Sequence, residues 1–167
     1  MEFRKATMND MPYIMNIFKQ AQNYFKENNI DQWQNNYPSE AIIRRDINNN
    51  DSYVMVDNDK IIATIYISFE EDEDYKNIYE GKWISEGDYC VIHRIALDNT
   101  YKGKGIFKNL IKQVEQMCIN KNITTIKVDT HEDNLNMQNA LKKNGFKYCG
   151  VVYVEGGEKR IAFERNF

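Results

Sequence analysis

The stretch from Tyr89 to Thr130 constrains the fold of this chain most, because a strand, a glycine-rich turn, a helix and a second strand follow one another in it. The segment Tyr89–Leu97, YCVIHRIAL, carries apolar residues on both of its faces. Such a pattern is typical of a central strand in a sheet that is covered on both sides. Apolar spacing from Ile106 to Cys118 predicts an amphipathic helix, and Ile123–Thr130 predicts the second strand. A strand–helix–strand crossover makes its two strands parallel neighbours.

The rest of the chain predicts further helices and mainly antiparallel strands. A short strand near Glu2–Ala6 precedes a helix that starts with a capping-box pattern at Thr7 and keeps helical apolar spacing to Phe25. Ser39 is a typical N-cap for a second helix that continues to about Ile47. The remaining predicted elements are strands at Tyr53–Val56 and Ile61–Phe69, a helix at Asn134–Asn144 and an antiparallel pair at Phe146–Val154 and Lys159–Phe167. The predicted order is therefore β-α-α-β-β-β-α-β-α-β-β.

The composition indicates one soluble domain over residues 1–167 and argues against several classes of protein. A net charge of −3 argues against a general nucleic-acid partner, which requires a basic face. The three cysteines are widely spaced and form no CxxC or Cys/His cluster, so we expect buried thiols and no metal site. No apolar run is long enough to cross a bilayer. We therefore expect a cytoplasmic protein with no membrane partner.

The turn YKGKGIFKNLI, residues 101–111, predicts a binding site for an anion. It is rich in lysine and has no acidic residue between Asp98 and Glu115, although the chain as a whole is acidic. A glycine turn before a helix presents backbone N–H groups at the positive end of the helix dipole, and glycine lets an anion approach them closely. A phosphate-bearing ligand fits this chemistry. A plain connection with solvated lysines is the alternative interpretation.

Two common phosphate-binding motifs fit this turn poorly. A P-loop needs Ser or Thr after its lysine, and the dinucleotide motif needs a third glycine where Lys108 stands. The turn resembles instead the [Q/R]-x-x-G-x-[G/A] motif of the GNAT superfamily of acyl-CoA-dependent N-acetyltransferases. Lys102 replaces the first residue of that motif, Gly105 matches its glycine, and Phe107 replaces its last small residue. The segments FRKATMNDM and DNLNMQNALKKNGFKYCG resemble the opening and late parts of the same family, in the same order.

The resemblance implies a fold, an activity and a co-substrate. The fold is α/β (α+β), a GNAT-type three-layer arrangement with a central mixed, mostly antiparallel sheet, a splayed parallel pair and about four flanking helices. The implied activity moves an acetyl group from acetyl-CoA, without a metal, to a small-molecule or peptide amine by direct attack in a ternary complex. A non-catalytic acyl-CoA-binding module, serving as a sensor or scaffold, is the alternative. The identity of the amine and the formation of a homodimer stay open.

The resemblance also implies which residues bind the cofactor. Backbone groups of Ile95, Ala96 and Leu97 would pair with the pantetheine amides, and one N–H there would polarise the thioester carbonyl. The late-helix residue Asn134 would touch the CoA arm, or else serve only as an N-cap. The backbone amides that would hold the pyrophosphate belong to Lys102, Gly103, Lys104, Gly105, Ile106, Phe107 and Lys108.

His93 is the candidate general base. It lies two residues before Ile95, where arylalkylamine-type members of the family also carry a histidine, and a primary amine must lose a proton before it attacks. A hydrogen-bonded core histidine is the alternative. Leu141 stands where many members have a tyrosine that protonates the leaving thiolate. Tyr148, Tyr153 or water are possible substitutes, and the sequence does not choose among them.

Two further regions are candidates for contact with the acceptor. Trp33 and Tyr37 lie between the first two helices, where this fold builds the acceptor wall, although core packing is the alternative role of Trp33. The acidic stretch Glu70–Asp74 opens a long connection. It is either an ordinary solvated loop or a rim that attracts a cationic acceptor.

Overall fold

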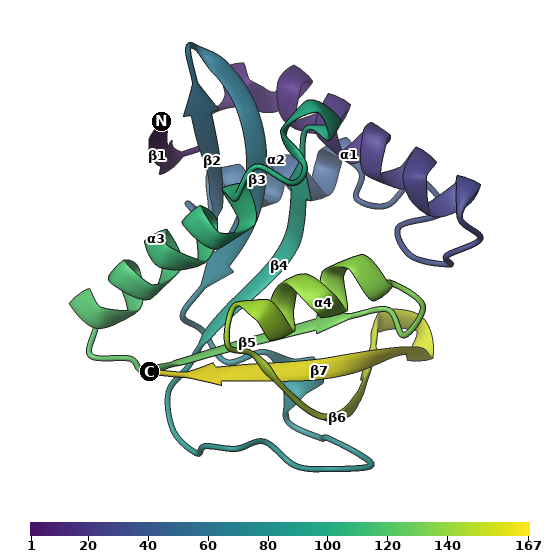
Figure 1. The fold of residues 1–167 in the computed structure, drawn as a ribbon, viewed down its shortest axis with the longest axis vertical. Coiled ribbons are helices and arrows are strands. Elements are labelled where there is room, and N and C mark those ends of the chain that lie inside the picture. The colour runs from purple at the N-terminus through teal and green to yellow at the C-terminus, as the bar shows by residue number, and fades with distance from the viewer. The chain divides into compact units, whose positions relative to one another are not determined.

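The computed structural model describes residues 1–167 and has the predicted order of helices and strands (Figure 1). The helices are α1 (Met11–Glu27), α2 (Glu40–Asn48), α3 (Ile106–Asn120) and α4 (Leu135–Lys143). The strands are β1 (Glu2–Lys5), β2 (Ser52–Asp57), β3 (Lys60–Ser68), β4 (Cys90–Leu97), β5 (Thr125–Thr130), β6 (Lys147–Val154) and β7 (Glu158–Asn166). None of the helices combines the length and the apolar character that crossing a membrane requires.

The seven strands form one mixed sheet in the order β1-β2-β3-β4-β5-β7-β6. Strands β4 and β5 run parallel, with Cys90 opposite Ile126 and Val91 opposite Lys127. The pairs β1–β2, β2–β3, β5–β7 and β6–β7 are antiparallel. The predicted α/β fold, with a mainly antiparallel sheet and one parallel pair, is confirmed.

The contacts divide the chain into two compact units. The first, called the N-terminal unit, comprises Met1–Ile67 and His93–Gln113. The second, called the C-terminal unit, comprises Ser68–Ile92 and Val114–Phe167. The single domain expected over residues 1–167 stays a prediction.

The core of the N-terminal unit lies between its first two helices and the strands beside them. Buried side chains of α1, α2, β2 and β3 form this core, and they include Ile14, Phe18, Ile43, Val54 and Ile61. Both predicted N-terminal caps are present. Thr7 and Asp10 form a capping box before α1, and the Ser39 hydroxyl accepts from the Ile42 amide at 3.3 Å at the start of α2.

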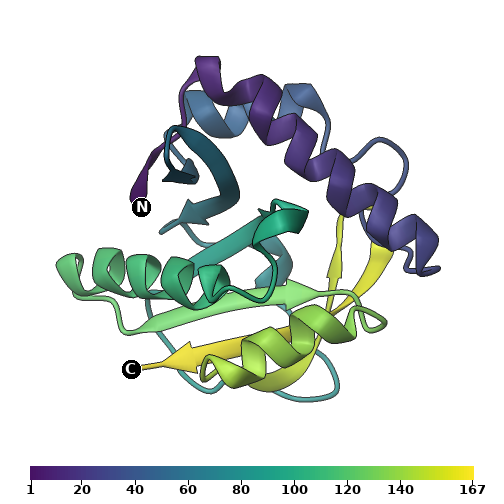
Figure 2. The same cartoon turned by 45° about the horizontal axis from the view of Figure 1, so that its top comes forward.

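In the C-terminal unit, α4 runs along β5 and β7 in both views of the ribbon (Figures 1 and 2). The long connection before β4 is fixed there by buried polar groups. The carboxylate of Glu164, which is 0% exposed, accepts hydrogen bonds from the Ile84 amide, the Ser85 amide and the Ser85 hydroxyl at 3.2, 3.0 and 2.8 Å. The Tyr75 hydroxyl donates to Asp129 at 2.6 Å. The connection is therefore an ordered part of this unit, although its acidic residue Glu70 is exposed.

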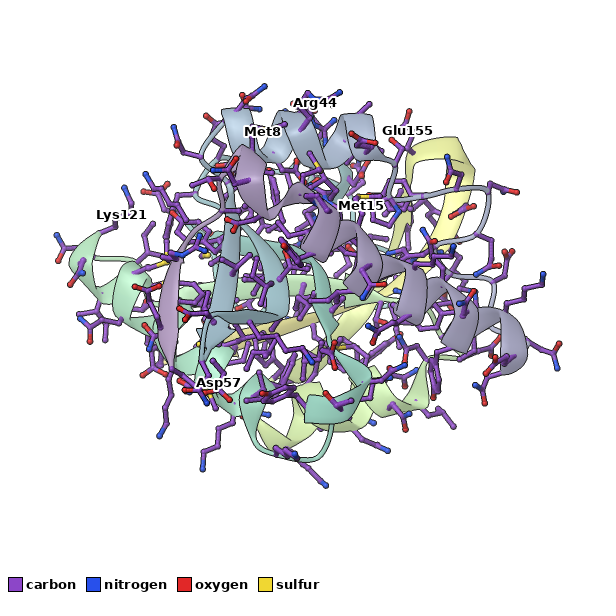
Figure 3. The ribbon with its side chains drawn as sticks, turned by 90° about the horizontal axis from the view of Figure 1, so that it is seen from above. Met8, Met15, Arg44, Asp57, Lys121 and Glu155 are labelled. Atoms are coloured by element: carbon purple, nitrogen blue, oxygen red, sulfur yellow. The ribbon has the colours of Figure 1, made fainter.

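Removing the Glu164 carboxylate should destabilise the C-terminal unit. Glu164→Ala removes the charged acceptor of the Ile84 and Ser85 amides, and a hydrogen bond to a charged group contributes about 1.5–3 kcal/mol. We expect a loss of about 3 kcal/mol in the free energy of unfolding, and a melting temperature lower by roughly 6–12 °C. Glu155→Ala, in the exposed turn between β6 and β7 (Figure 3), is the control and should change little. Equal melting temperatures for the two variants would contradict the anchoring role.

Candidate active site

The glycine turn before α3 has the backbone geometry that the anion-site prediction requires. Gly103 and Gly105 have φ angles of 76° and 78°, in the left-handed region that favours glycine. A Cβ atom added to either glycine would have no other atom within 4 Å, so both glycines border open space. Helix α3 begins at Ile106, directly after Gly105. The amides of its first turn have no partner within the helix and are therefore available to an acceptor.

The turn is held from two sides. Gln20 on α1 donates to Asp98 at 3.3 Å and accepts from the Asn99 amide at 2.8 Å. Asp98 also accepts from the Thr100 amide at 2.9 Å. Burial alone would raise the pKa of Asp98, but hydrogen bonds from Thr100 and Gln20 hold it below its usual value. At the other side, the Tyr101 hydroxyl donates to Asp57, at the end of β2 (Figure 3), at 2.9 Å.

Aromatic rings position two of the lysines in this turn. The Lys102 ammonium lies 4.5 Å from the centre of the Tyr24 ring, and partial burial lowers the pKa of Lys102. The Lys104 ammonium lies 5.3 Å from the centre of the Tyr101 ring. Neither ammonium is paired with a carboxylate of the chain. Their positive charge therefore remains available to an anionic ligand.

The strand before the turn carries the candidate base and the residues expected to pair with pantetheine. Ile95 and Ala96 are buried, whereas Leu97 and His93 are half-buried. The His93 imidazole lies against the Tyr66 ring of β3, with 5.7 Å between the ring centres. The structure thus places His93 on the same strand as the expected pantetheine-binding backbone, and both lead into the glycine turn.

Arg94, the neighbour of His93, was not among the residues singled out from the sequence. Its φ angle is 48°, which a residue with a Cβ atom rarely adopts inside a strand. Its Nε atom donates to Asp46 on α2 at 2.8 Å, and only 3% of the Asp46 side chain is exposed. Burial alone would lower the pKa of Arg94, but Tyr37 and Asp46 hold it above its usual value, so the guanidinium stays charged. An arginine inside a mainly apolar strand was the available sequence signal.

The two predicted acceptor-wall residues have different surroundings. Trp33 packs edge-on against Phe18 and Phe25, with 5.5 Å between ring centres in each pair. Tyr37 is 36% exposed, and its hydroxyl accepts from Nη1 of Arg94 at 3.0 Å. Tyr37 is thus brought to β4, whereas Trp33 lies against the core. Contact of either residue with an acceptor stays a prediction.

The remaining candidates lie in the C-terminal unit. The Asn134 side chain accepts from the Met137 amide at 3.2 Å and so caps α4, while its contact with the CoA arm stays a prediction. Leu141 is 0% exposed. Tyr148 and Tyr153 are 51% and 45% exposed, so both hydroxyl-bearing side chains reach the surface of this unit.

Comparison with known proteins identifies a family and several similar proteins. The model of the acetyltransferase (GNAT) family matches residues 16–146. The chain is 35% identical, over 65 residues, to the uncharacterized protein YxbD of Bacillus subtilis (strain 168); the match covers 39% of this chain and only 40% of that protein. A GNAT-family acetyltransferase from Streptococcus agalactiae 2603 has a similar structure, with a TM-score of 0.91 and 29% identity over 99% of this chain and 95% of that one. The PaiA N-acetyltransferase of Thermoplasma acidophilum, solved in complex with coenzyme A, shares the fold at a TM-score of 0.73 and 19% identity, over 99% and 98% of the chains.

Proposed function

Because the chain belongs to the acetyltransferase (GNAT) family, we propose that it transfers an acetyl group from acetyl-CoA to an amine by direct attack in a ternary complex. The observation that carries this proposal is the glycine turn. Gly103 and Gly105 have left-handed φ angles and open space beside them, directly before α3 and at the position of the family motif. The coenzyme A complex of the Thermoplasma acidophilum relative supports the choice of an acyl-CoA donor. The proposal keeps the cytoplasmic location expected from the sequence.

In the proposed mechanism the amides of the turn and of the first turn of α3 bind the pyrophosphate. The strand residues Ile95–Leu97 pair with pantetheine, and one of their N–H groups stabilises the negative charge that develops on the thioester oxygen. The amine nitrogen attacks the thioester carbon, a C–N bond forms and the C–S bond breaks. His93 accepts the proton that the amine loses.

The departing thiolate does not need a residue at the usual tyrosine position. Leu141 is an apolar residue of the core and has no proton to donate. A free thiol has a pKa of about 8.5, so its thiolate is a fair leaving group close to neutral pH. Water or an exposed tyrosine is then sufficient as the proton source.

Release of free thiol tests the proposal against its main alternative. The protein is incubated with acetyl-CoA and a panel of small amines and peptides, and thiol formation is followed over time. An acetyltransferase releases CoA in proportion to the amount of acetylated amine. Tight binding of acetyl-CoA without any thiol release would favour the non-catalytic module, a sensor or scaffold.

The acidic connection gives a separate prediction about cationic acceptors. Glu70 and Glu71 are exposed, whereas Asp72 accepts from the Asp74 amide at 2.9 Å and has a structural role. Changing Glu70 and Glu71 to glutamine should raise the KM of a polyamine acceptor roughly two- to fivefold at low ionic strength, with little change in kcat. The effect should fade as salt is added. An unchanged KM at every salt concentration would mean that these residues form an ordinary solvated loop.

A further inference from the structure

Arg94 is a buried cation held rigidly by three neighbours. Only 10% of its side chain is exposed. Asp46 accepts from Nε at 2.8 Å, the Tyr37 hydroxyl accepts from Nη1 at 3.0 Å, and the Tyr66 ring centre lies 4.4 Å from Cζ. Two edges and one face of the guanidinium plane are therefore fixed. Because its orientation is already set, it loses little conformational entropy when a ligand binds.

The guanidinium retains donors that the chain does not use. Arginine has five N–H groups, and Asp46 and Tyr37 account for two of them. Nη2 has no hydrogen-bond partner in the chain. Among fully buried side-chain polar atoms, Thr130 Oγ1 is the one without a partner. Nη2 of Arg94 also has no partner, so it is not fully buried and reaches solvent. A charged donor that is nearly buried and yet open at one edge is suited to an anionic oxygen of a ligand.

The local charge also favours an anion. The carboxylate of Asp46 is shared by two arginines, because its second oxygen accepts from Arg45 at 3.3 Å. Arg94, Arg45 and Asp46 together carry one net positive charge. A carboxylate bound to Arg94 would neutralise that charge, whereas a cationic group there would be repelled.

The separation between Arg94 and the candidate base sets the size of such a ligand. The Tyr66 ring centre lies 5.7 Å from the centre of the His93 imidazole and 4.4 Å from Cζ of Arg94, so these two groups are at most about 10 Å apart. A hydrogen bond at each end takes up about 3 Å. A ligand that runs straight from one group to the other therefore has about 4 Å or less between its amine and its carboxylate, and a short amino acid meets that span.

We propose that Arg94 binds the carboxylate of the acceptor, and that the acceptor is an amino acid whose amine then faces His93. This inference rests on the proposed acetyltransferase function and narrows its substrate class. Arg94 is the specificity-determining residue, and Tyr37 and Asp46 orient it. An amine of the same size without a carboxylate leaves Nη2 unpaired in the complex and binds less well.

Matched pairs of acceptors test the proposal. Each pair contains an amino acid and the amine left after removal of its carboxylate, such as phenylalanine with phenethylamine and valine with isobutylamine. We expect kcat/KM to be roughly 10- to 100-fold higher for the amino acid in at least one pair. Thiol release at equal rates with both members of every pair would overturn the inference and leave the acetyltransferase function standing. The absence of thiol release with every amine would instead contradict the acetyltransferase function.

Variants then link the preference to Arg94. In Arg94→Gln the ratio of kcat/KM between amino acid and amine should fall towards one, mainly through a higher KM for the amino acid. Arg94→Lys should restore only part of the ratio, because an ammonium cannot form a bidentate pair. Arg44→Gln, which removes an exposed arginine that extends outward from α2 (Figure 3), should keep the full ratio.

A second variant separates an effect on acceptor binding from an effect on folding. Arg94→Gln leaves Asp46 buried without its ion pair, which is expected to destabilise the unit. The double variant Arg94→Gln/Asp46→Asn removes both charges. Its melting temperature should return towards the wild-type value, whereas its ratio of kcat/KM between amino acid and amine should stay close to one. A folded double variant that retains the wild-type preference, or that loses turnover equally for both members of a pair, would contradict the role of Arg94.

Discussion

Replacing Gly105 with aspartate should abolish CoA binding while the fold stays largely intact. A side chain at this position enters open space, and aspartate tolerates the left-handed region better than most residues, so the cost to folding is about 1–2 kcal/mol. The added carboxylate, however, lies where the proposed pyrophosphate must approach the amides at the start of α3. Steric exclusion and charge repulsion together should weaken CoA binding by roughly 100-fold or more.

Gly157→Asp is a matched control for this substitution. Gly157 has a φ angle of 76°, a Cβ atom there would also meet no atom within 4 Å, and it lies between β6 and β7. Titration calorimetry with CoA should therefore give unchanged affinity for Gly157→Asp and no measurable binding for Gly105→Asp. Circular dichroism and melting curves establish that both variants are folded. Wild-type affinity in a folded Gly105→Asp variant would remove the phosphate-site assignment.

The order of elements could be predicted from the sequence because local signals determine it. The caps at Thr7 and Ser39 use residues within a few positions of the helix that they start. Apolar periodicity predicts the strand–helix–strand crossover. The predicted ends of its elements differ from the observed ends by one or two residues, as with β4, predicted at Tyr89–Leu97 and observed at Cys90–Leu97. Helix ends and strand ends depend on tertiary contacts, which a local pattern does not contain.

The parts that sequence reasoning missed depend on residues far apart in the chain. Glu164 holds the connection near Ser85 across 79 positions, and Arg94 reaches Asp46 across 48 positions. No periodicity or spacing rule links such pairs. The left-handed conformation of Arg94 likewise has no local signal, because nothing in its neighbours demands it.

His93→Gln should lower kcat/KM for the amine by about 10²–10⁴-fold, the usual cost of losing a general base. Glutamine keeps a similar size and a hydrogen-bonding group but cannot accept the proton of the amine. The imidazole must be neutral to act as a base, so wild-type kcat/KM should rise from acidic towards neutral pH, and the variant should lose that rise. Affinity for acetyl-CoA should hardly change, because it rests on backbone groups of β4 and on the glycine turn.

A structural role for His93 would give the opposite pattern. The imidazole is half-buried against Tyr66, so a purely structural histidine predicts a lower melting temperature in His93→Gln with the pH dependence retained. His131→Gln is the control, since His131 accepts from the Asp133 amide at 3.0 Å in the loop before α4 and has no part in the proposed mechanism. Rates from pH 5 to 9 and melting curves should be measured for both variants. Full activity of His93→Gln with an unaltered pH profile would rule out His93 as the base, and the proton of the amine would then have to pass to water.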